Sequence, residues 1–199
     1  MDAVETAWKE KLSCHHGEAA VLIRCDAYHQ DQLDKDCDAI QRIGTRYQAT
    51  IHQGEDARYW QIRDAISESL EVHFKHKVSE DITVPPGRIP DYLNAVKKLY
   101  MPKEVAVVAY GHLGDGNVHT NIVNMGLSDI EWHEQKDSYI DKVIECGLKM
   151  QGTLSGEHGI GLTKKQYMAQ YFSDTELSLM KRIKHSFDPH HILNPSKML

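Results

Sequence analysis

The spacing of apolar residues changes along the chain between two patterns. Short apolar or alternating runs predict strands, and apolar residues spaced three or four apart predict helices. The expected strands cover 19–25, 47–52, 79–86, 105–110 and 118–123. The expected helices cover about 33–44, 56–74, 93–101, 131–150 and 173–187. This order predicts an α+β fold, with a ferredoxin-like antiparallel sheet, helices packed on one of its faces and further helices at the C-terminus.

Several residues are expected to set the helix ends and the buried helix faces. Gly44 is placed to end the first helix, and Ser173 with Glu176 predicts a capping box at the start of the last one. The predicted inward faces carry Tyr59, Ile62, Ile66 and Leu70; Leu93, Val96 and Tyr100; Ile140, Val143, Ile144 and Leu148.

The segment that joins the last two strands carries the strongest chemical signal. Asp115-Gly116 is typical of a two-residue hairpin turn, and with that turn His112 would lie directly opposite His119. Opposed residues have Cβ atoms about 4.5–5.5 Å apart, so the two imidazoles would converge on one point. Two imidazoles suit a divalent metal such as zinc or manganese, and Glu157, framed by glycines, is the expected third ligand. The alternative is that these are ordinary surface residues in a chain that has 13 histidines.

Composition narrows the class of protein. The 199 residues are enough for one substantial domain, and the net charge of −6 argues against a nucleic-acid partner. No apolar run is long enough to predict a membrane span, and residues 1–12 do not resemble a signal or transit peptide. The four cysteines, Cys14 among them, show no Cys-x-x-Cys pairing, so they are expected to be reduced and structural. We therefore expect a cytoplasmic protein, or a mitochondrial one in a eukaryote.

Three motifs in order, GHLGDGNVH (111–119), SGEHGIG (155–161) and ILNPSKML (192–199), resemble the C-terminal, substrate-binding half of FAD-linked D-2-hydroxy acid dehydrogenases. That group belongs to the vanillyl-alcohol oxidase superfamily. In it the flavin domain precedes this half, so the resemblance implies that 1–199 is the substrate- and metal-binding domain and that the flavin domain is absent. The sequence contains no Gly-x-Gly-x-x-Gly fingerprint for a pyrophosphate. FAD would then be held mainly by a separate domain or subunit.

The resemblance also implies roles for residues outside the hairpin. Arg63, in a Trp-x-x-Arg motif, would hold the substrate carboxylate together with Ser67, and Asn194 and Lys197 would contact the flavin. Relatives that accept dicarboxylates carry a lysine before the third strand, and the offset of Lys77 does not match it well. A monocarboxylate such as lactate or glycolate is therefore the expected substrate.

Oxidation of a 2-hydroxy acid needs a base for the hydroxyl proton and an acceptor for the hydride. His158 is the expected base and also contacts the substrate, while Asn121, on the same strand face as His119, is expected to hydrogen-bond it. Electrons would then pass to a quinone or an electron-transfer flavoprotein, and assembly into a homo-oligomer stays open. Two alternatives from other classes are a stand-alone metal-binding or regulatory module without turnover and a metal-dependent hydrolase.

Overall fold

The structure is a computed structural model that describes residues 19–54 and 57–199. It divides into two compact units, Met1–His73 and Phe74–Leu199. The predicted start of the second helix at Asp56 and the prediction for Cys14 lie outside the described residues. No helix among the described residues is long and apolar enough to cross a membrane.

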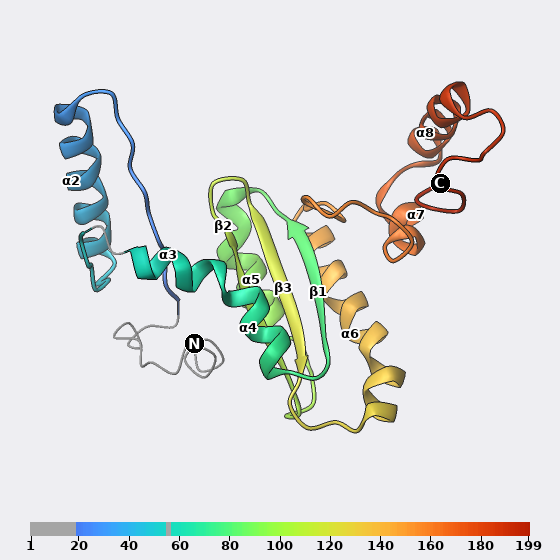
Figure 1. Ribbon diagram of the computed structural model, residues 1–199, viewed down its shortest axis with the longest axis horizontal. Coiled ribbons are helices and arrows are strands. Elements are labelled where there is room, and N and C mark those ends of the chain that lie inside the picture. Colours follow the sequence, from blue (N-terminus) through green and yellow to red (C-terminus); the bar gives the residue numbers. More distant parts are fainter. Residues whose placement is uncertain (1–18, 55–56) are drawn as a thin grey trace. The chain divides into compact units, whose positions relative to one another are not determined.

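The second unit is built on a three-stranded antiparallel sheet in the order β1-β3-β2 (Figure 1). Its strands are β1 (Lys77–Thr83), β2 (Val105–His112) and β3 (Asn117–Asn124), which is the central strand. Helix α5 (Ile89–Lys97) connects β1 to β2, and helix α6 (Asp129–Lys149) follows β3. Thr153 then forms an antiparallel bridge to Thr83 on the outer edge of β1. The element order is thus β-α-β-β-α followed by a short edge segment, and the predicted α+β class is confirmed.

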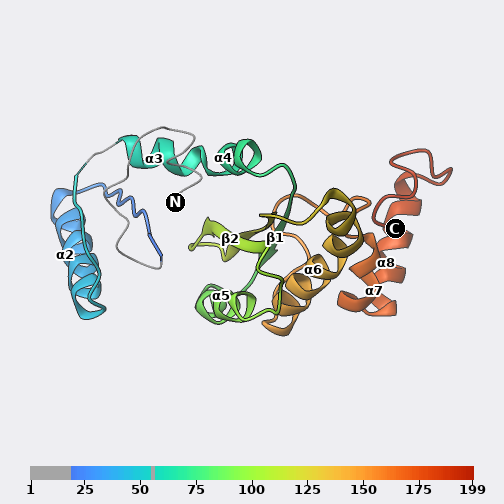
Figure 2. The same ribbon diagram turned by 90° about the horizontal axis from the view of Figure 1, so that it is seen from below.

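Helices α5 and α6 lie on the same side of this sheet (Figure 2). The Tyr92 hydroxyl of α5 hydrogen-bonds the Thr120 hydroxyl at 2.8 Å, and α6 packs on β1 through Gly147. Side chains on this face form the apolar core, which includes Ile82, Val84, Ile89, Tyr92, Val96, Val118, Ile122, Trp132, Val143, Ile144 and Leu154. The opposite face of the sheet carries Asp81, Tyr110, His119 and Asn121, because side chains alternate along each strand.

The helix ends and faces of this unit follow the sequence in part. Capping boxes start α6 at Ser128 and α8 (Asp174–Phe187) at Ser173, and the second of these was predicted. Helix α5 buries Ile89, Tyr92 and Val96, so the inward position predicted for Val96 is confirmed, whereas those predicted for Leu93 and Tyr100 are wrong because both side chains are exposed. The remaining short elements are η1 (Pro86–Arg88), η2 (Lys165–Tyr167) and α7 (Met168–Tyr171).

The first unit differs most from the sequence prediction. Its described part is helical, with α2 (Gln30–Arg46), α3 (Ala57–Asp64) and α4 (Ile66–His73), and the strands predicted at 19–25 and 47–52 are wrong. An apolar run favours extended backbone, but a strand also needs a partner edge, and no local pattern specifies that partner. Helix α2 continues through Gly44, and the helix predicted at 56–74 is interrupted by a turn at Ala65.

The contact between α6 and β1 gives a prediction about stability. A Cβ on Gly147 would lie 2.4 Å from Ile82 Cγ2, which is closer than real Cβ atoms come. Alanine improves helix propensity by about 1 kcal/mol over glycine, but overpacking a core costs about 1–3 kcal/mol. We therefore expect Gly147→Ala to lower the free energy of unfolding, measured by urea denaturation followed by circular dichroism.

Gly126→Ala is the matched control in the same unit. The nearest atom to a Cβ there is Glu104 Cγ at 3.3 Å, on a side chain that can move aside. The control should change stability by less than about 0.5 kcal/mol, as is usual for surface substitutions. A Gly147→Ala protein as stable as the original would contradict the close packing of α6 on β1.

Candidate functional site

The β2–β3 hairpin has a register two residues away from the predicted one. His112 pairs with Asn117 and Tyr110 pairs with His119, so residues 113–116 form the loop and the prediction of a two-residue turn is wrong. The loop is held by Asp115, whose side chain accepts the Asn117 N–H at 2.9 Å, and by Gly116, whose carbonyl accepts the Val84 N–H at 3.0 Å. Gly116 has a φ of 83°, and a Cβ there would lie 1.9 Å from the Val84 oxygen. This hydrogen bond holds Gly116 beside the residue that follows β1. A rule for turn types considers only the residues of the turn and does not include such a contact.

The two histidines nevertheless lie on the same face of the sheet. A shift of two residues preserves the face, because the side-chain period of a strand is two. The His112 and His119 ring centroids are 6.0 Å apart, on diagonal rather than directly opposed positions. The two rings therefore lie near each other, and their predicted convergence on one metal ion stays a prediction.

His119 lies at the centre of the candidate site. It is 8% exposed, and its Nε2 is 3.3 Å from Glu157 Oε1. Its ring stacks on that of His158, with centroids 5.6 Å apart. Burial lowers the pKa of His119, and the nearby Glu157 carboxylate opposes this only in part. His119 is consequently a neutral imidazole near neutral pH.

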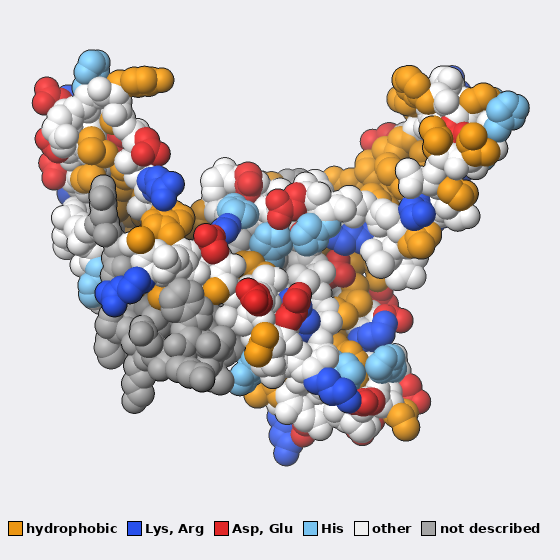
Figure 3. Space-filling model, viewed as in Figure 1, with side chains coloured by type: hydrophobic (Ala, Val, Ile, Leu, Met, Phe, Trp, Pro, Cys, Tyr) orange, Lys and Arg blue, Asp and Glu red, His pale blue; other side chains and the backbone are white. Residues whose placement is uncertain are grey.

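Three side chains of this site can share one cation. One ligand atom from each of His119, Glu157 and His158 lies within 4.8 Å of the other two. Figure 3 shows histidine side chains gathered beside acidic ones over the strands of the sheet. The predicted trio of His112, His119 and Glu157 overlaps this group in two members, and His158 takes the place of His112. Two imidazole nitrogens and a carboxylate oxygen are a donor set that suits zinc or manganese.

The loop that carries Glu157 and His158 is organised by Asp81 of β1. The Asp81 side chain is fully buried, and its Oδ2 accepts backbone N–H groups from Gly156 at 3.1 Å, Glu157 at 2.8 Å and His158 at 2.8 Å. Ser155 Oγ donates to the same oxygen at 3.0 Å. Burial alone would raise the pKa of Asp81, but hydrogen bonds from Lys164 and from these backbone groups hold it well below its usual value.

Lys164 supplies the positive charge for this buried carboxylate. It is 5% exposed, donates to Asp81 Oδ1, and lies 3.3 Å from Glu80 Oε2. Burial raises the pKa of Glu80, while the attraction of Lys164 works against the rise. The sequence analysis did not identify Asp81, Glu80 or Lys164. The signal was present, since two adjacent carboxylates inside a predicted strand are unusual in a sheet.

Asn121 lies on the predicted face and is fully buried. Its Nδ2 donates to the Val108 and His119 carbonyls, both at 3.3 Å. Its Oδ1 has no hydrogen-bond partner among the described residues. Because buried polar atoms are nearly always satisfied, this oxygen is a candidate acceptor for a ligand or a water.

Arg63 and Ser67 belong to the first unit. Arg63 lies in the last turn of α3 and forms an ion pair with Asp64 at 2.9 Å, while Ser67 lies in α4 beyond the turn at Ala65. The sequence predicted that both residues lie on one continuous helix, and this prediction is wrong. Their joint role at the substrate carboxylate stays a prediction.

Asn194 and Lys197 lie in the C-terminal tail and are exposed. The tail is hydrogen-bonded to the segment that follows His158, since Met198 donates its N–H to the Gly161 carbonyl at 2.8 Å. Lys165 Nζ also donates to the Ser196 carbonyl at 3.0 Å. The two predicted flavin contacts are therefore attached to the same loop region as Glu157.

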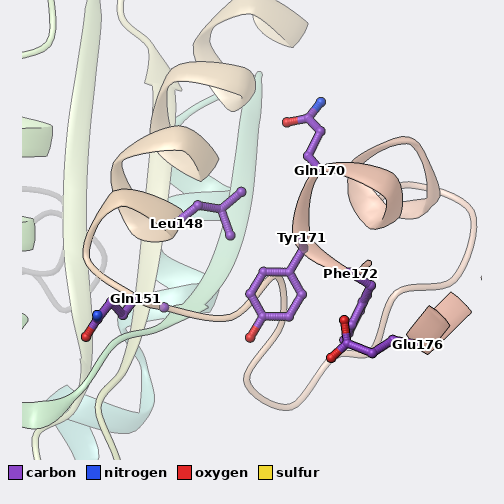
Figure 4. Close-up of a pocket in the computed structure, with 7 residues that line it drawn as sticks. Leu148, Gln151, Gln170, Tyr171, Phe172 and Glu176 are labelled. Carbon is purple, nitrogen blue, oxygen red and sulfur yellow. The ribbon is translucent and has the colours of Figure 1, made fainter. Parts of the chain in front are cut away.

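A separate pocket lies near the C-terminal end of α6. It is lined by Leu148, Gln151, Gly152, Gln170, Tyr171, Phe172 and Glu176, and Figure 4 shows Leu148 facing the segment that carries Tyr171. The single ionisable carboxylate in this lining, Glu176, accepts from the Ser173 N–H and hydroxyl in the capping box. None of these residues belongs to the histidine group, and the pocket presents no comparable chemistry.

Comparison with known proteins adds to this geometry. D-lactate dehydrogenase from Anaerostipes hadrus is 33% identical over 139 residues, which are 70% of this chain and 29% of that protein. D-2-hydroxyglutarate dehydrogenase from Stutzerimonas stutzeri is 35% identical over 143 residues, 70% of this chain and 30% of that protein. D-lactate dehydrogenase from Archaeoglobus fulgidus is 31% identical over 195 residues, 96% of this chain and 41% of that protein. The chain thus spans less than half of the length of each of these relatives.

The family described as FAD linked oxidases, C-terminal domain, matches residues 1–198. The match extends over both units and includes the hairpin, the Glu157-His158 loop and the tail. The chain therefore belongs to the family of FAD linked oxidase C-terminal domains.

Proposed function

We propose that this chain is the substrate- and metal-binding domain of a flavin-dependent dehydrogenase that oxidises a D-2-hydroxy acid to the 2-oxo acid. The observation that carries the proposal is the group formed by His119, Glu157 and His158, whose ligand atoms lie within 4.8 Å of one another in a member of this family. The names of the relatives, D-lactate and D-2-hydroxyglutarate dehydrogenase, support the substrate class. A lactate- or glycolate-like monocarboxylate is the substrate that we favour.

In this proposal His112, His119 and Glu157 bind one zinc or manganese ion. The lowered pKa of the His119 imidazole supports the assignment, because burial keeps it neutral and able to donate a lone pair. A divalent cation supplies Lewis-acid chemistry, since it lowers the pKa of a hydroxyl group that it binds. His112 is exposed and its ring centroid lies 6.0 Å from that of His119, and this proximity supports its inclusion in the trio.

His158 is the residue that accepts the substrate hydroxyl proton. Its side chain is 52% exposed, which leaves the ring accessible to a substrate, while its backbone N–H is anchored on Asp81 at 2.8 Å. A general base needs this combination of a fixed position and an open ring edge. His158 also hydrogen-bonds the substrate as the proton moves.

The rest of the substrate is held by Arg63, Ser67 and Asn121. An arginine matches a carboxylate through two parallel hydrogen bonds, and a serine hydroxyl can add a third donor. The unpartnered Oδ1 of Asn121 supports a role for this amide next to the reacting group. FAD, which would supply the hydride acceptor, would be held by a separate domain or subunit, with Asn194 and Lys197 as contacts from this chain. A quinone or an electron-transfer flavoprotein would be the electron acceptor of the assembled enzyme.

The metal assignment predicts about one zinc or manganese per chain. His119→Ala should abolish binding, because it removes the buried ligand around which the others are arranged, and His52→Ala, at an exposed histidine of the first unit, should leave the metal content unchanged. Elemental analysis of the purified proteins measures both. Full retention of metal in His119→Ala would refute the site.

The same measurement separates the two candidates for the third ligand. His112→Ala should lower metal affinity by more than the roughly 10–100-fold that follows from losing a residue that only supports a ligand, whereas His158→Asn should have little effect. The reverse order of effects would assign His158 as the ligand and remove it as the base.

Arg63→Lys tests how the substrate carboxylate is held, in the chain assembled with its flavin-binding partner. If Arg63 binds the carboxylate equally in the ground and transition states, lysine should raise KM and leave kcat nearly unchanged, because a point charge replaces a two-pronged match. Steady-state kinetics with D-lactate measure the two parameters. An unchanged KM would remove Arg63 from the substrate site.

His158→Asn tests the proton acceptor in the same assembled enzyme. Asparagine preserves the backbone hydrogen bond to Asp81 but cannot take the proton, so kcat should fall by roughly 10²–10⁴-fold with nearly unchanged substrate binding. A near-normal kcat at full metal content would exclude His158 as the base.

A further inference from the structure

We infer that Asp81 is a positioning residue, which fixes the backbone of the 155–159 loop so that Glu157 and His158 both point at His119. The inference rests on the proposed function, because it concerns the same metal and proton-transfer site. It assigns a role to a residue that touches neither the metal nor the substrate in the scheme above.

The placement of Glu157 and His158 requires such a device. Adjacent residues in an extended segment point to opposite sides, so two neighbours can serve one site only if the backbone between them is turned. Here both reach the same partner, with Glu157 Oε1 3.3 Å from His119 Nε2 and the His158 ring centroid 5.6 Å from that of His119. A loop of exposed residues does not hold such a conformation without fixed partners.

Asp81 provides the fixed partner. Three successive N–H groups, of Gly156, Glu157 and His158, converge on Oδ2 at 2.8–3.1 Å, so the turn of the backbone is defined by one oxygen atom. Ser155 extends the arrangement, because its hydroxyl donates to Asp81 and accepts the Gly159 N–H at 2.8 Å. The charged acceptor makes these hydrogen bonds about twice as strong as neutral ones.

The loop also lies close to the sheet. A Cβ on Gly156 would be 2.5 Å from both Thr83 Oγ1 and Asn117 Nδ2, so only glycine leaves room for the approach. The Gly156 N–H also lies 2.8 Å from the Asp81 carbonyl oxygen. Backbone and side chain of one β1 residue therefore fix the loop together.

The charge pairing argues for positioning rather than for net stabilisation. A buried ion pair such as Asp81–Lys164 contributes about as much stability as well-packed apolar residues of the same size, although removing one partner is strongly destabilising. An apolar pair in this position would keep the fold but would leave the three N–H groups without an acceptor. What the carboxylate specifically contributes is the geometry of the loop.

The test compares Asp81→Asn with Asp188→Asn. Asp188 is a matched control, because it is also buried and accepts from a lysine, Lys184, at 2.7 Å and from the consecutive N–H groups of Ile192 and Leu193. Both substitutions remove a buried charge that organises a loop, but only Asp81 is tied to the site loop. Two readouts are used: NMR amide exchange of Gly156, Glu157 and His158 in the metal-free chain, and zinc affinity by competition with a chelator.

In Asp81→Asn we expect exchange of these three amides to rise at least about tenfold and zinc affinity to fall by about 10–100-fold, the usual cost of losing a supporting contact. Asp188→Asn should leave both unchanged, whatever it does to overall stability. Should Asp81→Asn fail to fold, Ser155→Ala is the milder variant, with a smaller change in the same direction, since it leaves Lys164 paired.

Unchanged exchange and unchanged zinc affinity in the Asp81 variant would overturn the inference. Equal losses in both aspartate variants would overturn it as well, because they would report general destabilisation. If the original chain binds no zinc but Asp81→Asn selectively frees the three amides, the positioning role stands and the metal part of the proposed function fails.

Discussion

The site depends on one buried negative charge. Asp81 lies in β1 with no exposed surface. Its carboxylate is stable there because protein donors take the place of water: Lys164, the Ser155 hydroxyl and three backbone N–H groups. An ionised carboxylate without these partners would cost several kcal/mol to bury. The sheet, the 155–159 loop and Lys164 are therefore mutually dependent, since each supplies what the others leave unsatisfied.

Glycines make this dependence geometrically feasible. Gly147 lets α6 approach β1, Gly152 would place a Cβ within 2.6 Å of the Thr83 carbonyl, and Gly156 lets the loop reach the strand. Together they bring the chain that leaves α6 back along the outer edge of β1. The loop that carries Glu157 and His158 therefore lies beside β1, where these glycines allow the close approach.

The sequence predicted the parts of the site that depend on local rules. The capping box at Ser173 follows from spacing, and the common face of His112 and His119 survived an error of two residues because strand faces repeat every second residue. The exact register of β2 and β3 was not predictable from local rules. The loop between them is held by a hydrogen bond from Val84 to Gly116, two residues that are distant in the sequence. For the same reason Asp81 was missed: its partners lie more than seventy residues further on, and a carboxylate in a strand has no local explanation. The strands at 19–25 and 47–52 were wrongly predicted because an apolar run alone does not show whether a neighbouring strand is available to pair with it.

Lys164 has a further consequence for how the two sides of the sheet communicate. Glu80 and Asp81 are consecutive residues of β1, so Glu80 points into the apolar core beneath the helices and Asp81 toward the histidines, yet a single ammonium group reaches both around the strand edge. The core and the site thus share one counter-ion. A change in the core that moves Glu80 therefore also changes how much of the positive charge of Lys164 remains for Asp81, so the interior of the domain can tune the electrostatics of the opposite face through this shared lysine.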